Sequence, residues 1–161
     1  MRQIISILPE PNPTLRPTAH DGGDAPAASI SGVVLFRQGI KVVVAEDDRV
    51  SQAVLTMILQ KFGLEVHVAS DGRQALALVR EVRPDLILMD MQMPIMDGAE
   101  AIRILRADVD APQPPVVVLS ANRMTDGQID SLHSLGVNEF LLKPVNRARL
   151  AAVLGLLLPK A

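Results

Sequence analysis

The chain has 161 residues, of which 48% are hydrophobic and 21% charged, and this length fits one domain with a substantial core. It carries 16 Lys and Arg against 18 Asp and Glu, so the formal net charge is -2. No overall basic field exists to hold a nucleic-acid backbone, and we expect no nucleic-acid partner. The absence of Cys excludes disulfides and thiolate catalysis and is compatible with a reducing cytoplasm.

No apolar stretch reaches the ~18 residues that a membrane-spanning helix needs. The longest such stretch, residues 150–158, lies near the end of the chain. At the start, the apolar run 4–8 is followed by Pro9, Pro11 and Pro13, which leaves too little for a secretory signal. We therefore expect a cytoplasmic protein with no membrane partner.

Residues 1–40 hold five of the 12 prolines and show no sustained hydrophobic period. This composition is typical of a flexible N-terminal tail or linker. The exception is ISGVVLF at residues 30–36, which is apolar enough to pack on something, either as an added strand or as the scar of a preceding domain. The linker is the interpretation that we prefer for the whole segment.

From Lys41 onward, short runs rich in β-branched residues alternate with helical stretches, and the runs predict strands. They are residues 41–45, 64–69, 85–89, 115–119 and 139–142. The first helical stretch is predicted from apolar residues at helical spacing, which would form its apolar face and which are followed by Gly63 as a C-terminal cap. These residues are Val50, Val54, Met57, Ile58 and Phe62.

The second and third helices are predicted to begin after Asp71 and Asp97, whose carboxylates can cap free backbone amides. A fourth helix is predicted over residues 125–135, ending at Gly136, and a fifth over 146–157. Five strands that alternate with five helices indicate an α/β fold, a (βα)5 chain. Because the strands are continuously apolar, the sheet should be parallel and doubly wound, with helices on both faces.

Polar residues follow four of the five predicted strands. In a parallel sheet these positions meet at one edge, where ligands bind. Carboxylates gathered there would repel one another unless a cation is present, and an all-oxygen ligand set favours Mg²⁺, with Mn²⁺ possible. The residues are Glu46, Asp47 and Asp48 after the first strand, Asp90 after the third, Ser120 after the fourth and Lys143 after the fifth.

Lys143 and Ser120 offer an ammonium group and a hydroxyl at the same edge. Such groups suit the oxygens of a phosphoryl group in transfer, where catalysis is mostly positioning and charge neutralisation. The nucleophile would then be a carboxylate. Asp90 is the natural candidate, because it stands alone on the central strand and faces the acidic run.

Four motifs in this order resemble the receiver domain of two-component response regulators, the CheY-like fold: AEDD at 45–48, LILMDMQMPIMDG at 86–98, VVVLSA at 116–121 and FLLKP at 140–144. The resemblance implies a five-stranded sheet in the order 2-1-3-4-5 and a receiver domain over residues 41–158. The motifs are closest to those of single-domain or hybrid-kinase receivers.

The resemblance also implies a role for each matched residue. Asp90 corresponds to the phosphoacceptor, Lys143 to the lysine that pairs with the phosphoryl group, and Ser120 and Phe140 to the two switch residues. Glu46 and Asp47 correspond to the acidic pair that holds Mg²⁺ together with Asp90, and the backbone carbonyl of Gln92 would complete that site. The pair Asp47 and Asp48 remains the alternative, and the Lys143–Pro144 peptide bond is expected to be cis.

The implied function is a signalling switch phosphorylated on Asp90 by a sensor histidine kinase or a histidine phosphotransfer protein. It is not an enzyme in the usual sense, because it catalyses only its own phosphorylation and dephosphorylation. Output would pass through the fourth helix, fifth strand and fifth helix, and we expect no output domain after them. The alternatives are a phosphorelay intermediate, a receiver piece of a hybrid histidine kinase, and an adaptor that works without phosphorylation.

Overall fold

The structure, a computed structural model, describes residues 35–161. Five strands and five helices alternate along this part of the chain. They are β1 (Lys41–Ala45), α1 (Arg49–Lys61), β2 (Glu65–Ala69), α2 (Gly72–Val82), β3 (Leu86–Asp90), α3 (Gly98–Ala107), β4 (Val116–Ser120), α4 (Asp126–Ser134), β5 (Glu139–Leu142) and α5 (Arg147–Leu157). Each predicted strand and helix is present, with bounds that differ by one or two residues at most.

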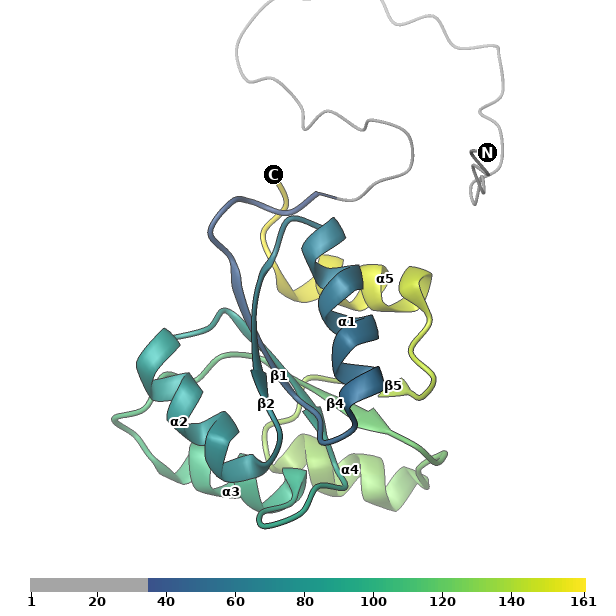
Figure 1. The fold of residues 1–161 in the computed structure, drawn as a ribbon. Coiled ribbons are helices and arrows are strands. Elements are labelled where there is room, and N and C mark those ends of the chain that lie inside the picture. The colour runs from purple at the N-terminus through teal and green to yellow at the C-terminus, as the bar shows by residue number, and fades with distance from the viewer. Residues whose placement is uncertain (1–34) are drawn as a thin grey trace, which may run out of the picture.

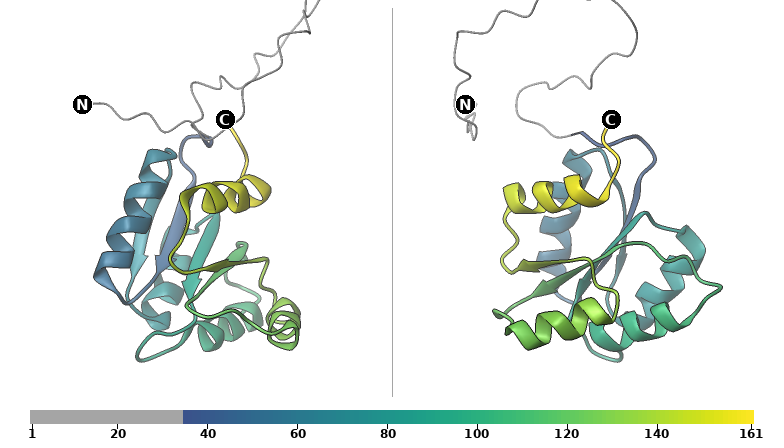
Figure 2. Two further views of the ribbon diagram at one scale, coloured as in Figure 1. Left: turned by 90° about the vertical axis from the view of Figure 1, so that its right-hand side faces the viewer. Right: turned by 180° about the vertical axis from the view of Figure 1, so that it is seen from behind.

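The five strands form one parallel sheet in the order β2-β1-β3-β4-β5. α1 and α5 cover one face, and α2, α3 and α4 cover the other (Figures 1 and 2). The predicted doubly wound α/β fold and its strand order are therefore confirmed. The carboxyl ends of β1 and β3 lie side by side at the centre of one edge.

Side chains of the central strands alternate between two hydrophobic cores, as the two-residue period of a strand requires. On β1, Val42 and Val44 enter the core beneath α1 and α5. Val43 enters the core beneath α2, α3 and α4. All of these side chains are fully buried. Burial on both faces explains why these strands read as unbroken apolar runs.

α2 and α3 begin at the two caps that the sequence predicts. The carboxylates of Asp71 and Asp97 accept hydrogen bonds from the backbone amides of Gln74 and Glu100, at 2.9 and 2.8 Å. Thr125 caps α4 and Asn146 caps α5. The expected cap that ends α1 is also present, because Gly63 has a φ of +83°, a conformation that glycine adopts at little cost.

The predicted apolar face of α1 is wrong at Val50, Val54 and Met57 and right at Phe62. Leu55, Leu59 and the capping Phe62 are the residues that enter the core, whereas Val50 is 71% exposed. Val54 and Met57 are exposed as well, and Ile58 lies at the margin of the core. The helix carries two apolar stripes, and periodicity alone does not say which of them meets the sheet.

Residues just before β1 pack on the core, although they fall in the segment expected to be a tail. Phe36 is buried, and its ring meets that of Phe62 edge to face with 6.1 Å between centroids. Ile40 is buried too. The Leu35 carbonyl accepts a hydrogen bond from the Ala161 amide at 3.3 Å, so this segment lies beside the end of the chain (Figure 1). Residues 1–34, the rest of the expected tail, lie outside the described residues.

Among the helices of residues 35–161, none is long and apolar enough to cross a membrane.

Candidate functional site

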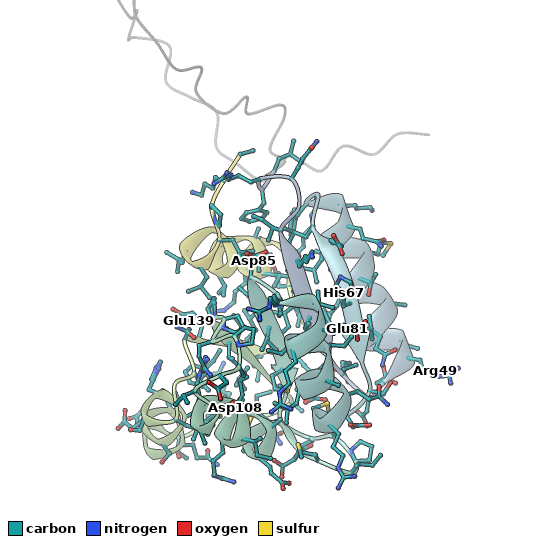
Figure 3. All side chains as sticks on the ribbon, turned by 90° about the vertical axis from the view of Figure 1, so that its left-hand side faces the viewer. Arg49, His67, Glu81, Asp85, Asp108 and Glu139 are labelled. Atoms are coloured by element: carbon teal, nitrogen blue, oxygen red, sulfur yellow. The ribbon has the colours of Figure 1, made fainter. Side chains whose placement is uncertain are left out.

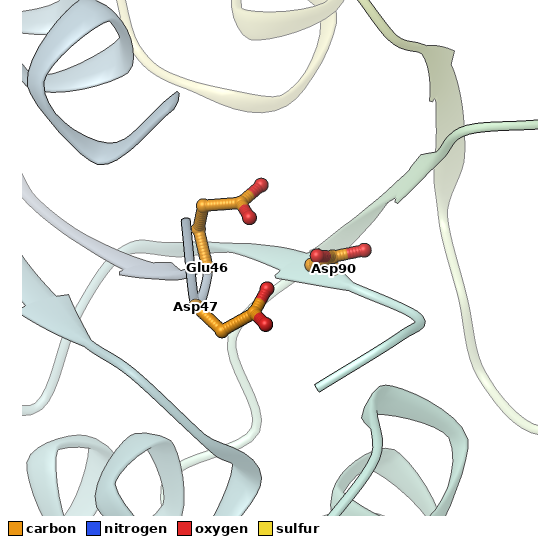
Figure 4. A group of neighbouring side chains, drawn as sticks. All are labelled: Glu46, Asp47 and Asp90. Carbon is orange, nitrogen blue, oxygen red and sulfur yellow. The ribbon is translucent and has the colours of Figure 1, made fainter. Parts of the chain in front are cut away.

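Three carboxylates meet at the carboxyl edge of the sheet. Glu46 and Asp47 follow β1 directly, and Asp90 is the last residue of the neighbouring strand β3. One oxygen from each of the three lies within 4.8 Å of the others, and the carboxylates point into a common space (Figure 4). Glu46 and Asp90 are buried, whereas Asp47 is exposed to solvent.

Lys143 reaches this cluster from the end of β5. Its ammonium Nζ lies 2.6 Å from Glu46 Oε2 and 2.9 Å from Asp90 Oδ2. The Lys143 backbone amide also donates to the Ser120 carbonyl at 2.8 Å, so β4 helps to place it. With three carboxylates and one ammonium group, the cluster keeps a formal charge of -2, from -3 and +1. This arrangement favours a further cation.

Burial and ion pairing shift the pKa values of Glu46 and Lys143 in opposite directions. Burial raises the pKa of Glu46 above its ordinary value, and the hydrogen bond from Lys143 opposes that rise without cancelling it. Burial alone lowers the pKa of Lys143, but its bonds to Glu46 and Asp90 outweigh burial, so the pKa of Lys143 is raised. Lys143 therefore stays charged at neutral pH.

The third acid of the run, Asp48, has a different place. Its carboxylate accepts a hydrogen bond from the Ser51 amide at 2.7 Å and caps α1. This bonding lowers the pKa of Asp48. Of the two pairs that the sequence left open, the geometry brings Glu46 and Asp47 to Asp90 and assigns Asp48 to the helix.

Asp90 is held from both of its carboxylate oxygens. Oδ2 bonds Lys143, and Oδ1 accepts a hydrogen bond from the Gln92 amide at 3.2 Å. Gly98 passes so close that a Cβ there would lie 2.2 Å from the Asp90 carbonyl oxygen. Only glycine permits this approach. The sequence pattern predicted only a helix cap at Asp97-Gly98. It did not indicate the contact between Gly98 and Asp90.

The two expected switch residues lie on neighbouring strands, Ser120 at the carboxyl end of β4 and Phe140 within β5. The Ser120 hydroxyl donates to the Asn122 carbonyl at 2.7 Å, within its own loop. Ser120 and Gln92 also line a pocket of about 570 Å³ that extends along the start of α4. Phe140 is half-buried, and its ring meets that of His133 on α4 edge to face, with 4.9 Å between centroids. The expected cis bond at Lys143–Pro144 is present.

Comparison with known families decides what this arrangement is. Residues 42–155 match the response regulator receiver domain family. The chain belongs to that family. A related protein, the DNA-binding response regulator MtrA of Mycolicibacterium paratuberculosis, is 38% identical over 112 residues, which are 70% of this chain and 48% of that protein. The chain thus spans about half the length of the curated relatives that it matches first.

Solved receiver domains have the same fold. The receiver domain of the sensor histidine kinase PA1611 from Pseudomonas aeruginosa, described with a magnesium ion in its active-site cleft, is 34% identical with a TM-score of 0.66, covering 74% of this chain and 97% of that one. The receiver domain of Ssk1 from Saccharomyces cerevisiae, solved with the histidine phosphotransfer protein Ypd1, is 30% identical with a TM-score of 0.63, covering 73% and 86%.

Proposed function

We propose that this receiver domain is a signalling switch that accepts a phosphoryl group on Asp90 from a phosphohistidine. The observation that carries this proposal is the bridging position of Lys143, whose ammonium contacts both Asp90 and Glu46. A cation held against the candidate nucleophile can pair with an added phosphoryl group without rearrangement of the sheet. The fold and the family support the same function.

In the proposed reaction, a carboxylate oxygen of Asp90 attacks the phosphorus atom of the donor. An O–P bond forms, and the P–N bond to the donor imidazole breaks. The electron pair returns to the imidazole nitrogen, which then takes up a proton from water. The chain thereby modifies itself and turns over no separate substrate, in keeping with a signalling module rather than an enzyme.

The acidic cluster fits Mg²⁺. Its ligand atoms are carboxylate oxygens, which hard divalent cations prefer, and the formal charge of -2 calls for such an ion. Glu46, Asp47 and Asp90 would hold it, with the Gln92 carbonyl as the expected further ligand and Mn²⁺ as a possible substitute. The ion would neutralise charge on the phosphoryl oxygens. Lys143 keeps Glu46 and Asp90 close together before the ion arrives.

The switch is expected to act through Ser120 and Phe140. Ser120 would leave its bond to Asn122 and turn toward the phosphoryl oxygens, and Phe140 would rotate inward from its contact with His133. If one conformation binds the phosphoryl group more tightly than another, phosphorylation raises its population. The size of this shift is set by the difference in binding free energy between the two conformations. Output would follow as a change on the surface of α4, β5 and α5.

The exposed stripe of α1 supports a protein as the phosphoryl donor. Val50, Val54 and Met57 are exposed on one side of this helix, which begins next to the acidic cluster. Arg49 points outward at the same end (Figure 3). A helical phosphotransfer domain could cover this stripe while it presents its phosphohistidine to Asp90. The Ssk1 receiver, which resembles this chain, was solved with a histidine phosphotransfer protein.

Two other functions stay open to the same test. As a phosphorelay intermediate, or as a receiver piece of a hybrid kinase, the domain would pass its phosphoryl group to a second histidine. As an adaptor, it would bind partners without modification. The complete set of Asp90, Glu46, Asp47 and Lys143 favours the phosphorylated forms over the adaptor, because an adaptor needs no gathered charge.

The test is transfer from a phosphorylated histidine phosphotransfer protein or kinase. We expect Asp90→Asn to block transfer. Val54→Asp should slow transfer from the protein donor but leave labelling by acetyl phosphate unchanged. The matched control is Ile104→Asp, which adds the same charge at a 39% exposed apolar position on α3. Partner binding that is identical in Asp90→Asn and wild type, with and without donor, would favour the adaptor instead.

A further inference from the structure

Gln52 lies on the side of α1 that faces the carboxyl ends of β1 and β2. Its side-chain Nε2 donates a hydrogen bond to the backbone carbonyl of Glu46. The same nitrogen lies 3.2 Å from the hydroxyl oxygen of Ser70, the residue that follows β2. A carbonyl can only accept, so this contact fixes which end of the Gln52 amide faces the strand.

The Glu46 carbonyl belongs to the peptide unit that joins Glu46 to Asp47, two of the three acids of the cluster. On the other side of Glu46, the backbone amide donates to the Ala69 carbonyl at 3.0 Å. Gln52 therefore completes the anchoring of the Glu46 backbone, on the side where the strand pairing stops. The rotation of this peptide sets the directions in which the Glu46 and Asp47 side chains leave the chain.

Gln52 is itself held in place. The Ser70 amide donates to Gln74 Oε1 at 3.0 Å, which ties the end of β2 to α2. The first helical bond of α1, from the Gln52 amide to the Asp48 carbonyl at 2.9 Å, fixes the other end of the residue. Its amide thus joins α1 to the ends of two strands and, through Ser70, to α2.

We infer that Gln52 is a positioning residue for the divalent-cation site: through the Glu46 carbonyl, it orients the acidic pair before the ion binds. This inference rests on the proposed function. Groups that orient metal ligands by hydrogen bonding, without touching the metal, typically weaken metal affinity by about 10–100-fold when they are removed. Gln52 should act in this way, although it touches neither the ion nor the phosphoryl group.

The test is a Mg²⁺ titration of the full chain, followed by amide chemical shifts. Gln52→Met keeps the length of the side chain but removes its donor, and it should weaken Mg²⁺ binding by about tenfold or more. Gln52→Glu replaces the donor with acceptor oxygens and should do the same. Gln60→Met, at an exposed position on the same helix, is the control and should bind Mg²⁺ as wild type does.

A second measurement separates positioning from general stability. In the metal-free protein, hydrogen exchange at the amides of residues 46–48 should quicken in both Gln52 variants, while exchange in β3 and β4 stays slow. Wild-type Mg²⁺ affinity in a folded Gln52→Met or Gln52→Glu would overturn the inference. If wild type bound no Mg²⁺, the proposed function would be rejected. The role of Gln52 would be rejected separately if hydrogen exchange at residues 46–48 were the same in wild type and in the Gln52 variants.

Discussion

Asp47 and Asp48 are neighbours at the end of β1, but their side chains have different contacts. This difference leads to a prediction for each residue. Asp47 faces Asp90, whereas Asp48 caps α1. Asp47→Ala should abolish Mg²⁺ binding and phosphorylation together, because the cluster loses one of its three carboxylates. Asp48→Ala should keep both activities and instead lower the melting temperature, through loss of the cap. Mg²⁺ titration and thermal unfolding of both variants provide the check. An indispensable Asp48 together with a dispensable Glu46 would show that the ligand pair is the other one.

Burial of Glu46 makes the stability of the metal-free domain depend on pH. Because burial raises the pKa of Glu46 in the folded state above its ordinary value of 4.5, the folded state holds this proton more tightly than the unfolded state does. The stability that this provides is complete below pH 4.5 and is lost as the pH rises through the folded pKa.

Glu46→Gln removes this titration. The free energy of unfolding of the variant minus that of wild type should therefore be larger at pH 7 than at pH 4. Urea unfolding at both pH values, without Mg²⁺, measures the difference. If this difference in unfolding free energy were smaller at pH 7 than at pH 4, the direction assigned to the pKa of Glu46 would be contradicted.

The sequence allowed the acids, Ser120 and Lys143 to be placed at one edge, because each follows a strongly apolar run and parallel strands share their carboxyl ends. It gave no means of finding Gln52 or the tight contact of Gly98. A glutamine that donates to a backbone carbonyl leaves no motif, and the approach of Gly98 to Asp90 depends on how the loop after β3 folds back.

At the scale of elements, α1 shows where periodicity fails. The sequence predicted the caps Asp71 and Asp97 correctly, since a cap is a local interaction between a side chain and the next turn. The direction of a helix face is not local. Because α1 has apolar residues on two sides, the sheet beneath it selects the stripe of Leu55 and Leu59 and leaves the other exposed.

This orientation of α1 predicts unequal effects of similar truncations. Leu59 is fully buried, so Leu59→Ala should lower the free energy of unfolding by about 2–5 kcal/mol. Val54 is 42% exposed, so Val54→Ala should change it by no more than about 0.5 kcal/mol. Chemical denaturation of both variants measures the two values. Equal losses would mean that α1 is rotated relative to this description.

At the scale of the whole molecule, the chain closes on itself where it enters and leaves the domain. The segment before β1 runs beside the residues after α5, with Phe36 paired to Lys160 and its ring against Phe62. Local composition favoured a linker here, because residues 1–40 hold five of the 12 prolines and show no sustained hydrophobic period. Burial of Phe36 depends on a partner far along the chain, which composition cannot reveal.

We therefore propose that the folding unit begins near Leu35 rather than at Lys41. A chain of residues 35–161 should melt at the temperature of the full chain. Removal of residues 1–40 should lower the melting temperature by at least about 5 °C, because the core loses Phe36 and Ile40. Phe36→Ala in the full chain should reproduce most of this loss. The control is Leu35→Ala, at a 46% exposed position. Equal melting of both shortened chains would restore the boundary at Lys41.

The central claim is that Asp90 receives the phosphoryl group with the help of a divalent cation. Its most direct test is to incubate the full chain with acetyl phosphate and Mg²⁺ and to map the modified residue by mass spectrometry. We predict a single added phosphoryl group on Asp90, absent from Asp90→Asn and absent when Mg²⁺ is chelated. A wild-type chain that stays unmodified, or a phosphoryl group found on Ser120 or another residue, would contradict the claim.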